Sequence, residues 1–286
     1  LGKSCWHYAV SMGSRKPQQN PSSKSKRRRS ISTPKSKKKT KRNKLAVQAN
    51  AQALCEEDSK NAESVSVISP ASEQRRFILS EFQSANSCQL SSIEHEAIKD
   101  TSFVGLPDSA GIQDTREAPS LEQLIKKIFR NDWKEALCQG RLIEGEVEAG
   151  SPAVLMISMS AIRSIELLRS VRSMTAECHG VKLFSKHMKV DEQVATLKNR
   201  VNFASGTPSR LKKMIDIEAL HLTRLKLLVL DIRPDVKGYS LFTLPQVRDE
   251  FWDLYRTYFH QKLLQGQLNF CLYGPIPDEK VSKDKR

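Results

Sequence analysis

The sequence has no apolar run long enough to cross a membrane. A membrane-spanning helix needs roughly 18 or more consecutive apolar residues, and no window of this chain approaches that length. The first residues also lack the apolar core of a secretory signal peptide. We therefore expect a soluble intracellular protein that makes no contact with membranes. The chain begins with Leu1, and Met12 is a plausible start of translation.

Cysteine is scarce, and the six cysteines lie far apart without any Cys-x-x-Cys pair. This spacing excludes a disulfide-rich secreted scaffold. Cys178 and His179 are adjacent and His187 is near them, but no second Cys/His pair has the spacing of zinc ligands. We interpret these residues as buried or loop residues, and we expect no metal site.

Acidic residues are absent from the first 44 residues, which hold 15 of the 47 lysines and arginines. The rest of the chain has 32 basic and 32 acidic residues, so the net charge of +15 belongs to this amino-terminal segment. Its charges repel one another, and it has too few large apolar residues to offset the entropy of ordering. We predict a disordered basic tail over residues 1–71 and a short disordered end over residues 281–286.

Two dense basic clusters in this tail predict nuclear import or contact with RNA. Together they have the form of a two-part nuclear localisation signal, and the same charges would bind phosphates by releasing counterions. A tail that only improves solubility is the alternative. The predicted localisation residues are Lys26, Arg27, Arg28, Arg29, Lys37, Lys38, Lys39, Lys41 and Arg42.

Apolar runs alternate with amphipathic segments in the second half of the chain, which predicts an α/β domain over residues 72–280. Unbroken apolar runs are typical of strands buried on both faces, and strict alternation implies right-handed crossovers and a mainly parallel sheet. We expect a single three-layer α/β/α domain. The predicted strands are 153–159, 181–184, 201–205, 225–231 and 268–274, and the predicted helices are 72–84, 119–129, 160–174, 191–199, 207–215 and 244–264.

The helical patterns also predict which side chains face the core. Ser72 is the expected N-cap of the first helix. Helix 160–174 should turn Ile162, Ile165, Leu168 and Val171 inward. Helix 244–264 carries an aromatic-rich stripe that predicts core packing, with the docking of a partner as the alternative. The stripe consists of Val247, Phe251, Leu254, Tyr255, Tyr258 and Phe259.

The order of the motifs resembles the first RecA-like domain of DEAD-box RNA helicases, a P-loop NTPase-like fold. GTPSRL (206–211) stands where that family has TPGR, and LLVLD (227–231) stands where its strand delivers the DEAD acids. Arg163, in AVLMISMSAIRSIEL, matches the arginine of the PTREL motif. The strand 268–274 stands where Ser-Ala-Thr would follow. The resemblance implies a RecA-like domain with degenerate motifs.

The residues that hydrolyse ATP in that family are missing here. No GxxxxGK[ST] loop occurs, so the lysine that holds the phosphates is absent. Asp231 matches the first acid of motif II, but Ile232 replaces the glutamate, and Cys271-Leu272-Tyr273 stand near the place of Ser-Ala-Thr. We also expect no second RecA-like domain in this chain. We predict a protein that is not an enzyme and uses no ATP, cofactor or small-molecule substrate, with a divergent ATP-dependent helicase as an alternative.

Arg163, Thr207 and Arg210 are the candidate RNA-binding residues. Thr207 precedes a predicted helix, whose free N–H groups favour a phosphate, and the two arginines carry matching charge. The alternative is that Thr207 only caps the helix that Pro208 starts. Exposure of both arginines on one rim would favour RNA binding, whereas burial against acids such as Glu166 would favour a structural role.

Beyond the single motifs, the sequence resembles the Cms-type small-subunit ribosome assembly proteins, which have a degenerate DEAD-box domain. The resemblance covers about residues 75–275 and implies a nuclear, chiefly nucleolar, non-enzymatic factor. Its implied partners are pre-rRNA and pre-ribosomal proteins. A protein scaffold whose domain makes no direct RNA contact is the alternative. The resemblance rests on EFQSANSCQLSSIEHEAIKDTSFVGLP, VLMISMSAIRSIELLRSVRSM, KLFSKHMKV, ASGTPSRL and LKLLVLD.

Overall fold

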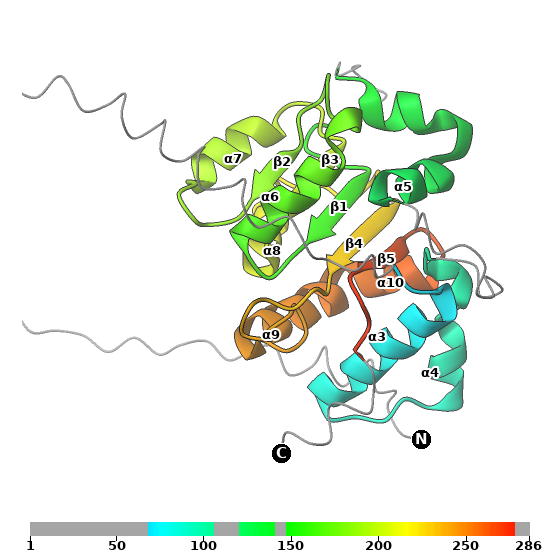
Figure 1. Cartoon of the computed structure of the whole chain (residues 1–286). Coiled ribbons are helices and arrows are strands. Elements are labelled where there is room, and N and C mark those ends of the chain that lie inside the picture. Colours follow the sequence, from blue (N-terminus) through cyan, green and yellow to red (C-terminus); the bar gives the residue numbers. More distant parts are fainter. Residues whose placement is uncertain (1–67, 106–119, 141–146, 278–286) are drawn as a thin grey trace, which may run out of the picture. The chain divides into compact units, whose positions relative to one another are not determined.

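A five-stranded parallel sheet runs through the part of the chain that the computed structural model describes, residues 68–105, 120–140 and 147–277. Its strand order is β2-β3-β1-β4-β5, and every neighbouring pair is parallel (Figure 1). All five predicted strands are present. Their bounds are β1 (Val154–Ile157), β2 (Val181–Leu183), β3 (Phe203–Gly206), β4 (Leu227–Asp231) and β5 (Asn269–Tyr273).

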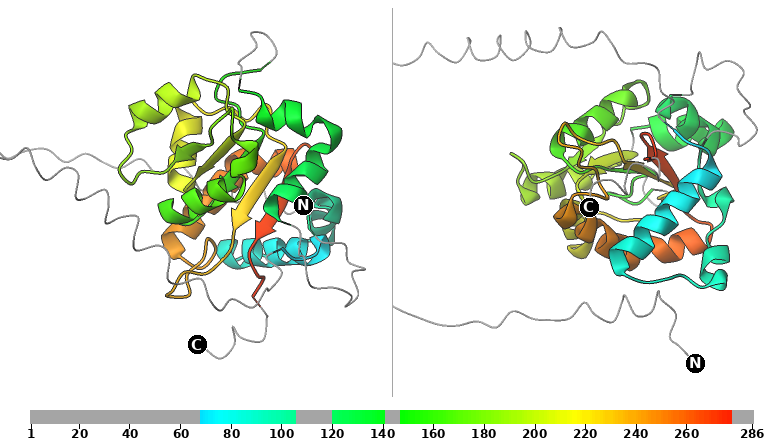
Figure 2. Two further views of the ribbon diagram at one scale, coloured as in Figure 1. Left: turned by 45° about the horizontal axis from the view of Figure 1, so that its top comes forward. Right: turned by 60° about the horizontal axis from the view of Figure 1, so that its bottom comes forward.

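Helices cover both faces of the sheet, as the views in Figure 2 show. The apolar residues of two helices join the core on one face, and those of five helices join it on the other. The first layer holds α5 (Leu121–Phe129) and α6 (Ala161–Ser170). The second layer holds α3 (Ala71–Asn86), α7 (Val190–Leu197), α8 (Pro208–Asp216), α9 (Pro245–Leu254) and α10 (His260–Leu264). The predicted three-layer α/β/α fold with a parallel sheet is thus confirmed.

Short helical turns connect these elements. They are α4 (Ser92–Ala97), η1 (Asp100–Ser102), η2 (Arg130–Asp132), η3 (Lys134–Cys138), η4 (Arg172–Met174) and η5 (Tyr255–Phe259). The segment η5 is a π-helical turn that joins α9 to α10, so the predicted helix 244–264 is one helical path with a wider turn in its middle. No helix within the described ranges combines the length and apolarity needed to span a bilayer.

The aromatic stripe of α9 and η5 belongs to the core. Phe251, Tyr255 and Phe259 are almost fully buried. Trp252, which the predicted stripe did not include, is also buried, with its ring 4.9 Å from Phe251 and edge-to-face to it. Aromatic pairs prefer this arrangement. Four of the six stripe residues are thus core residues, and Val247 and Tyr258 are partly buried against the same core.

Two predictions about helices are wrong. Ser72 does not cap the first helix, because α3 already begins at Ala71, with Pro70 at the N-cap position. Ile162 does not face the core, and 63% of it is exposed. The buried stripe of α6 is set by Ser164 and Leu167, and Ile162, two residues before Ser164, is about 200° around the helix from it.

A buried glutamine ties α3 to the sheet. Gln74 Nε2 donates hydrogen bonds to the carbonyl oxygens of Ser69 at 2.7 Å and Val104 at 3.0 Å. Its Oε1 accepts the N–H of Leu272 in β5 at 2.8 Å. Because a buried amide is costly unless its hydrogen bonds are made, this contact also fixes how α3 sits on the sheet.

The predicted tail lies almost entirely outside the described residues. This is true of all nine predicted nuclear localisation residues and of the predicted carboxyl-terminal end. The domain bounds and the localisation signal therefore stay predictions.

Candidate functional site

The carboxyl edge of the sheet is where the fold gathers the predicted site residues. All strands of a parallel sheet point the same way, so the loops that follow them meet at one edge. The loop after β1 leads into α6 and Arg163, the loop after β3 contains Thr207, and β4 ends at Asp231.

Asp231 is held by an arginine of its own loop. Arg233 donates two side-chain hydrogen bonds to it, from Nε to Oδ1 at 2.9 Å and from Nη2 to Oδ2 at 2.8 Å. The Arg233 backbone N–H also donates to Oδ1 at 3.1 Å. The Asp231 side chain is 1% exposed. Its negative charge is therefore neutralised inside the loop, and both oxygens are occupied.

Arg233 makes two further contacts that strengthen this arrangement. Its Nη2 lies 3.5 Å from Glu166 Oε2, and its guanidinium stacks 4.7 Å from the ring centroid of Tyr273. Burial alone would lower the pKa of Arg233, but the hydrogen bond and charge of Asp231 outweigh it, so the pKa is raised. Arg233 was not among the residues predicted for the site. Its signal was the basic residue two positions after the retained acid, in the segment IRPD.

Arg163 joins the same ionic network. Its Nη1 lies 3.2 Å from Glu166 Oε2, and its Nη2 donates to the carbonyl oxygen of Pro234 at 3.0 Å. Glu166 thus bridges Arg163 on α6 and Arg233 on the loop after β4. Arg163 and Asp231 are therefore linked through Glu166 and Arg233.

Arg210 lies with α7 and not with this network. Its Nη1 donates to Gln193 Oε1 at 2.6 Å and to the carbonyl oxygen of Met188 at 3.3 Å. Both arginines are half-buried and bind protein partners, and within the described ranges Arg163 alone is paired with an acid, Glu166. RNA contact by Arg163, Thr207 and Arg210 stays a prediction.

Thr207 occupies the N-cap position of α8, as expected, and Pro208 begins the helix. Its side chain makes no capping hydrogen bond, whereas its backbone N–H donates to the carbonyl oxygen of Leu183 at 3.1 Å. Gly206 before it passes close to the same strand, since a Cβ there would lie 2.0 Å from Leu183 O. The Thr207 hydroxyl is thus left for another partner.

At the carboxyl edge of the sheet, the charges of Arg163, Glu166, Arg233 and Asp231 are paired with one another. A divalent cation in a phosphate-transfer site needs carboxylate oxygens that are free to bind it, and Arg233 occupies both oxygens of Asp231. Within the described ranges, no group of three or more His, Cys, Asp or Glu residues is arranged to hold a metal ion.

The family model described as "CMS1: U3-containing 90S pre-ribosomal complex subunit" matches residues 14–273. The human protein CMSS1 is 32% identical over 170 residues, which make up 59% of this chain and 56% of that protein. Protein CMS1 of Chaetomium thermophilum is 32% identical over 145 residues, 50% of this chain and 55% of that protein. The chain spans about half the length of the curated relatives that it matches.

Among solved structures, a DEAD box protein from the hyperthermophile Methanococcus jannaschii aligns at 18% identity and a TM-score of 0.30. The alignment covers 48% of this chain and 34% of that one. The match of the family model spans most of the sequence and agrees with the resemblance stated above. The chain therefore belongs to the CMS1 family.

Proposed function

We propose that this protein is a non-enzymatic factor in the assembly of the small ribosomal subunit, which binds RNA and ribonucleoprotein in the nucleolus. The observation that carries the proposal is the match over residues 14–273 to a family described as a subunit of a U3-containing 90S pre-ribosomal complex. A subunit of such a particle works among RNA and proteins, so its expected partners are pre-rRNA and pre-ribosomal proteins.

The geometry of the carboxyl edge supports a binding role over ATP hydrolysis. In phosphoryl transfer, an acid at the end of the strand must be free to position a metal ion or water. Asp231 is instead 1% exposed and bound by Arg233 through both of its oxygens. We infer that the chain neither binds nor hydrolyses ATP in its role.

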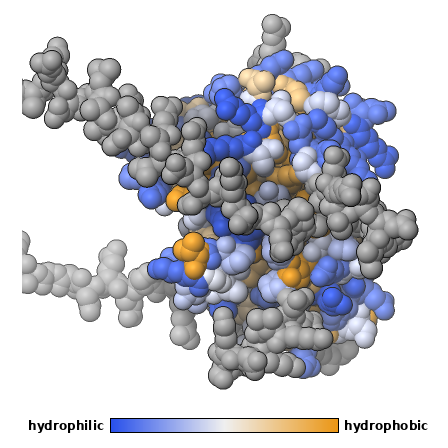
Figure 3. Space-filling view, in the orientation of Figure 1, coloured by the Kyte–Doolittle hydropathy of each residue, from blue (hydrophilic) through white to orange (hydrophobic). Residues whose placement is uncertain are grey.

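The described surface offers little to the alternative of a pure protein scaffold. Docking surfaces of stable protein complexes usually have a contiguous apolar centre. On the face in Figure 3, hydrophilic residues predominate and apolar residues form separate spots. Within the described ranges, the large exposed apolar residues are Ile93, Ile162 and Ile217, with Val236 and Tyr239 in the loop after β4.

The proposal is tested by sedimentation of the tagged full-length chain from cell extract. We expect it to migrate with large ribonucleoprotein particles, to recover U3 RNA on affinity purification, and to move to light fractions after ribonuclease treatment. Migration with light fractions before any treatment, without enrichment of U3 RNA, would refute the assembly role.

A further inference from the structure

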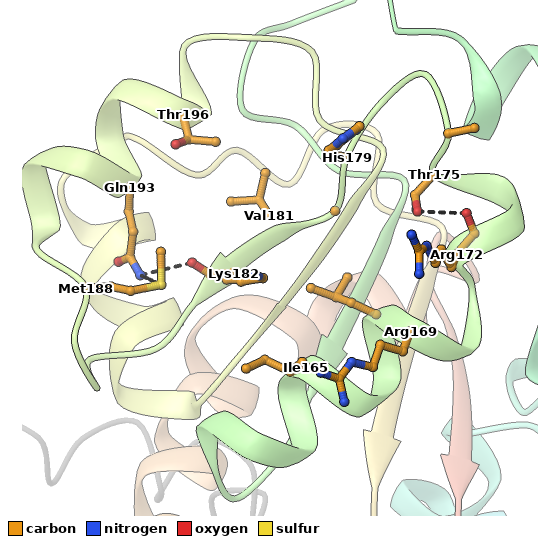
Figure 4. Close-up of a pocket in the computed structure, with 13 residues that line it drawn as sticks. Ile165, Arg169, Arg172, Thr175, His179, Val181, Lys182, Met188, Gln193 and Thr196 are labelled. Atoms are coloured by element: carbon orange, nitrogen blue, oxygen red, sulfur yellow. Dashed lines mark hydrogen bonds between the residues drawn. The ribbon is translucent and has the colours of Figure 1, made fainter. Parts of the chain in front are cut away.

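A hollow of about 750 Å³ lies beside β2, the strand at one edge of the sheet. Figure 4 shows its walls, which come from α6 and the turns after it, from β2 and from α7. Ile165, Val181 and Met188 supply apolar surface to it. The hollow is thus a mixed surface, apolar in part, and it lies apart from the network around Asp231.

The charged residues that line this hollow are all basic. They are Arg169, Arg172 and Lys182, and no acidic residue is among the described residues that line it. Arg169, Arg172 and Lys182 are exposed, and none of the three forms an ion pair within the described ranges. They differ in this from Arg163 and Arg233, which share Glu166. A concentration of unpaired positive charge favours an anionic ligand.

The edge of β2 is already closed to an added peptide strand. The carbonyl oxygen of Leu183 faces β3 and accepts from Thr207. The carbonyl oxygens of Lys182 and Phe184 both accept from Gln193 Nε2 at 3.0 Å. A peptide that binds by strand addition needs such carbonyl groups free. The arrangement therefore disfavours an acidic peptide held as an extra strand.

We propose that this hollow binds a segment of single-stranded RNA. Phosphates lie on the side chains of Arg169, Arg172 and Lys182, because a guanidinium group binds phosphate through paired hydrogen bonds and the lysine ammonium attracts it as a point charge. A base lies against the apolar part of the lining near Ile165 and Val181. This inference rests on the proposed function and locates the RNA contact of the domain at a new site.

Arg210 has a positioning role in this site. It donates to Gln193 Oε1, and Gln193 in turn holds the carbonyl oxygens at the edge of β2. Since Met188 and Gln193 both line the hollow, Arg210 shapes its wall from behind.

The test measures binding of a fluorescent single-stranded RNA of mixed sequence by the full chain. Both tail clusters are replaced by serine so that their charges do not mask the domain. We expect Arg169→Glu/Arg172→Glu to weaken binding at least tenfold and Lys182→Glu at least threefold. The slope of log affinity against log salt should fall in magnitude by about 1.4 for the double variant, since each phosphate contact to a single strand contributes about 0.7.

Arg76→Glu/Lys99→Glu is the matched control, because it makes the same change of charge at exposed residues of α3 and of the segment after α4. We expect it to alter affinity less than threefold. Ultraviolet cross-linking should place the RNA on peptides that contain residues 165–188. Equal affinity of the hollow and control variants would overturn the site, as would cross-links found only elsewhere.

Two further outcomes separate this site from the proposed function. If the tail-substituted chain binds no RNA while the unaltered chain still migrates with ribonucleoprotein particles, the site is refuted and the assembly role stands. If a polyglutamate peptide binds the hollow and RNA does not compete with it, the ligand is an acidic protein and the RNA site is likewise refuted.

Discussion

Asp231 and Arg233 show how two residues can take over a position that resembles a catalytic one. Replacing Arg233 with Ala would leave the buried carboxylate of Asp231 without its partner. Removing one member of a buried ion pair costs roughly 3–5 kcal/mol. We expect about 3 kcal/mol of lost unfolding free energy, measured by urea denaturation, because Arg233 is 23% exposed.

The matched control for Arg233→Ala is Lys237→Ala, which removes the same charge from an exposed residue of the same loop and should change stability by less than about 0.5 kcal/mol. The double variant Asp231→Ala/Arg233→Ala should lose less unfolding free energy than the two single variants lose together, because it removes both charges of the pair and leaves no buried charge without a partner. Strict additivity would contradict the pairing.

His260 predicts a dependence of stability on pH. It is 6% exposed, and its Nδ1 lies 3.2 Å from the hydroxyl oxygen of Tyr255. Burial lowers its pKa to about 4, although the charge of Glu94 opposes this. As the pH falls, His260 is protonated in the unfolded chain before it is protonated in the folded chain. The free energy of unfolding therefore keeps its full value above about pH 6.5 and decreases as the pH drops toward 4. Each unit of difference in pKa is about 1.4 kcal/mol, which limits the loss to about 3 kcal/mol.

The check is urea denaturation between pH 7 and pH 4 of the parent chain and of His260→Gln. Glutamine does not titrate, so the variant should lose less stability than the parent over this interval. Parallel curves for the two proteins would show that His260 does not carry the effect.

The contact between β3 and β2 depends at the element scale on Gly206. A Cβ at this position would lie 2.0 Å from the carbonyl oxygen of Leu183 and 2.8 Å from its carbonyl carbon. Because these are backbone atoms of a paired strand, they have little room to move away. We expect Gly206→Ala to cost at least about 2 kcal/mol, within the range of overpacked cores, as measured by thermal or urea denaturation.

Ser205→Ala is the neighbouring control. The Ser205 hydroxyl is buried and has no hydrogen-bond partner within the described ranges, so its removal should be neutral or stabilising by up to about 1 kcal/mol. A Gly206→Ala protein as stable as Ser205→Ala would contradict the close approach of the two strands.

The strands could be predicted from the sequence because unbroken apolar runs have few other uses in a domain of this size. The bounds of each observed strand lie within two residues of its predicted bounds. The partners of the charged residues could not be predicted. The hydrogen bond from Arg163 to Pro234 joins residues 71 positions apart. The local sequence shows a basic residue two positions after Asp231, but it does not show that Arg233 would bind both oxygens of that carboxylate.

The net charge of +15 comes from the first 44 residues, and the other residues have equal numbers of basic and acidic side chains. The predicted basic tail should therefore give an affinity for RNA that depends steeply on salt and little on the RNA sequence. The domain adds the unpaired basic residues beside β2 and the closed network at the carboxyl edge. Under the proposed function, both the tail and the hollow beside β2 would bind RNA through basic side chains.

The affinity of the full chain for single-stranded RNA, measured with and without magnesium and ATP at constant ionic strength, tests this account most directly. Because Asp231 is occupied by Arg233, no nucleotide-driven change should reach the RNA site, and the two dissociation constants should agree within a factor of two. A change of tenfold or more on adding magnesium and ATP would contradict the account and indicate an active nucleotide site.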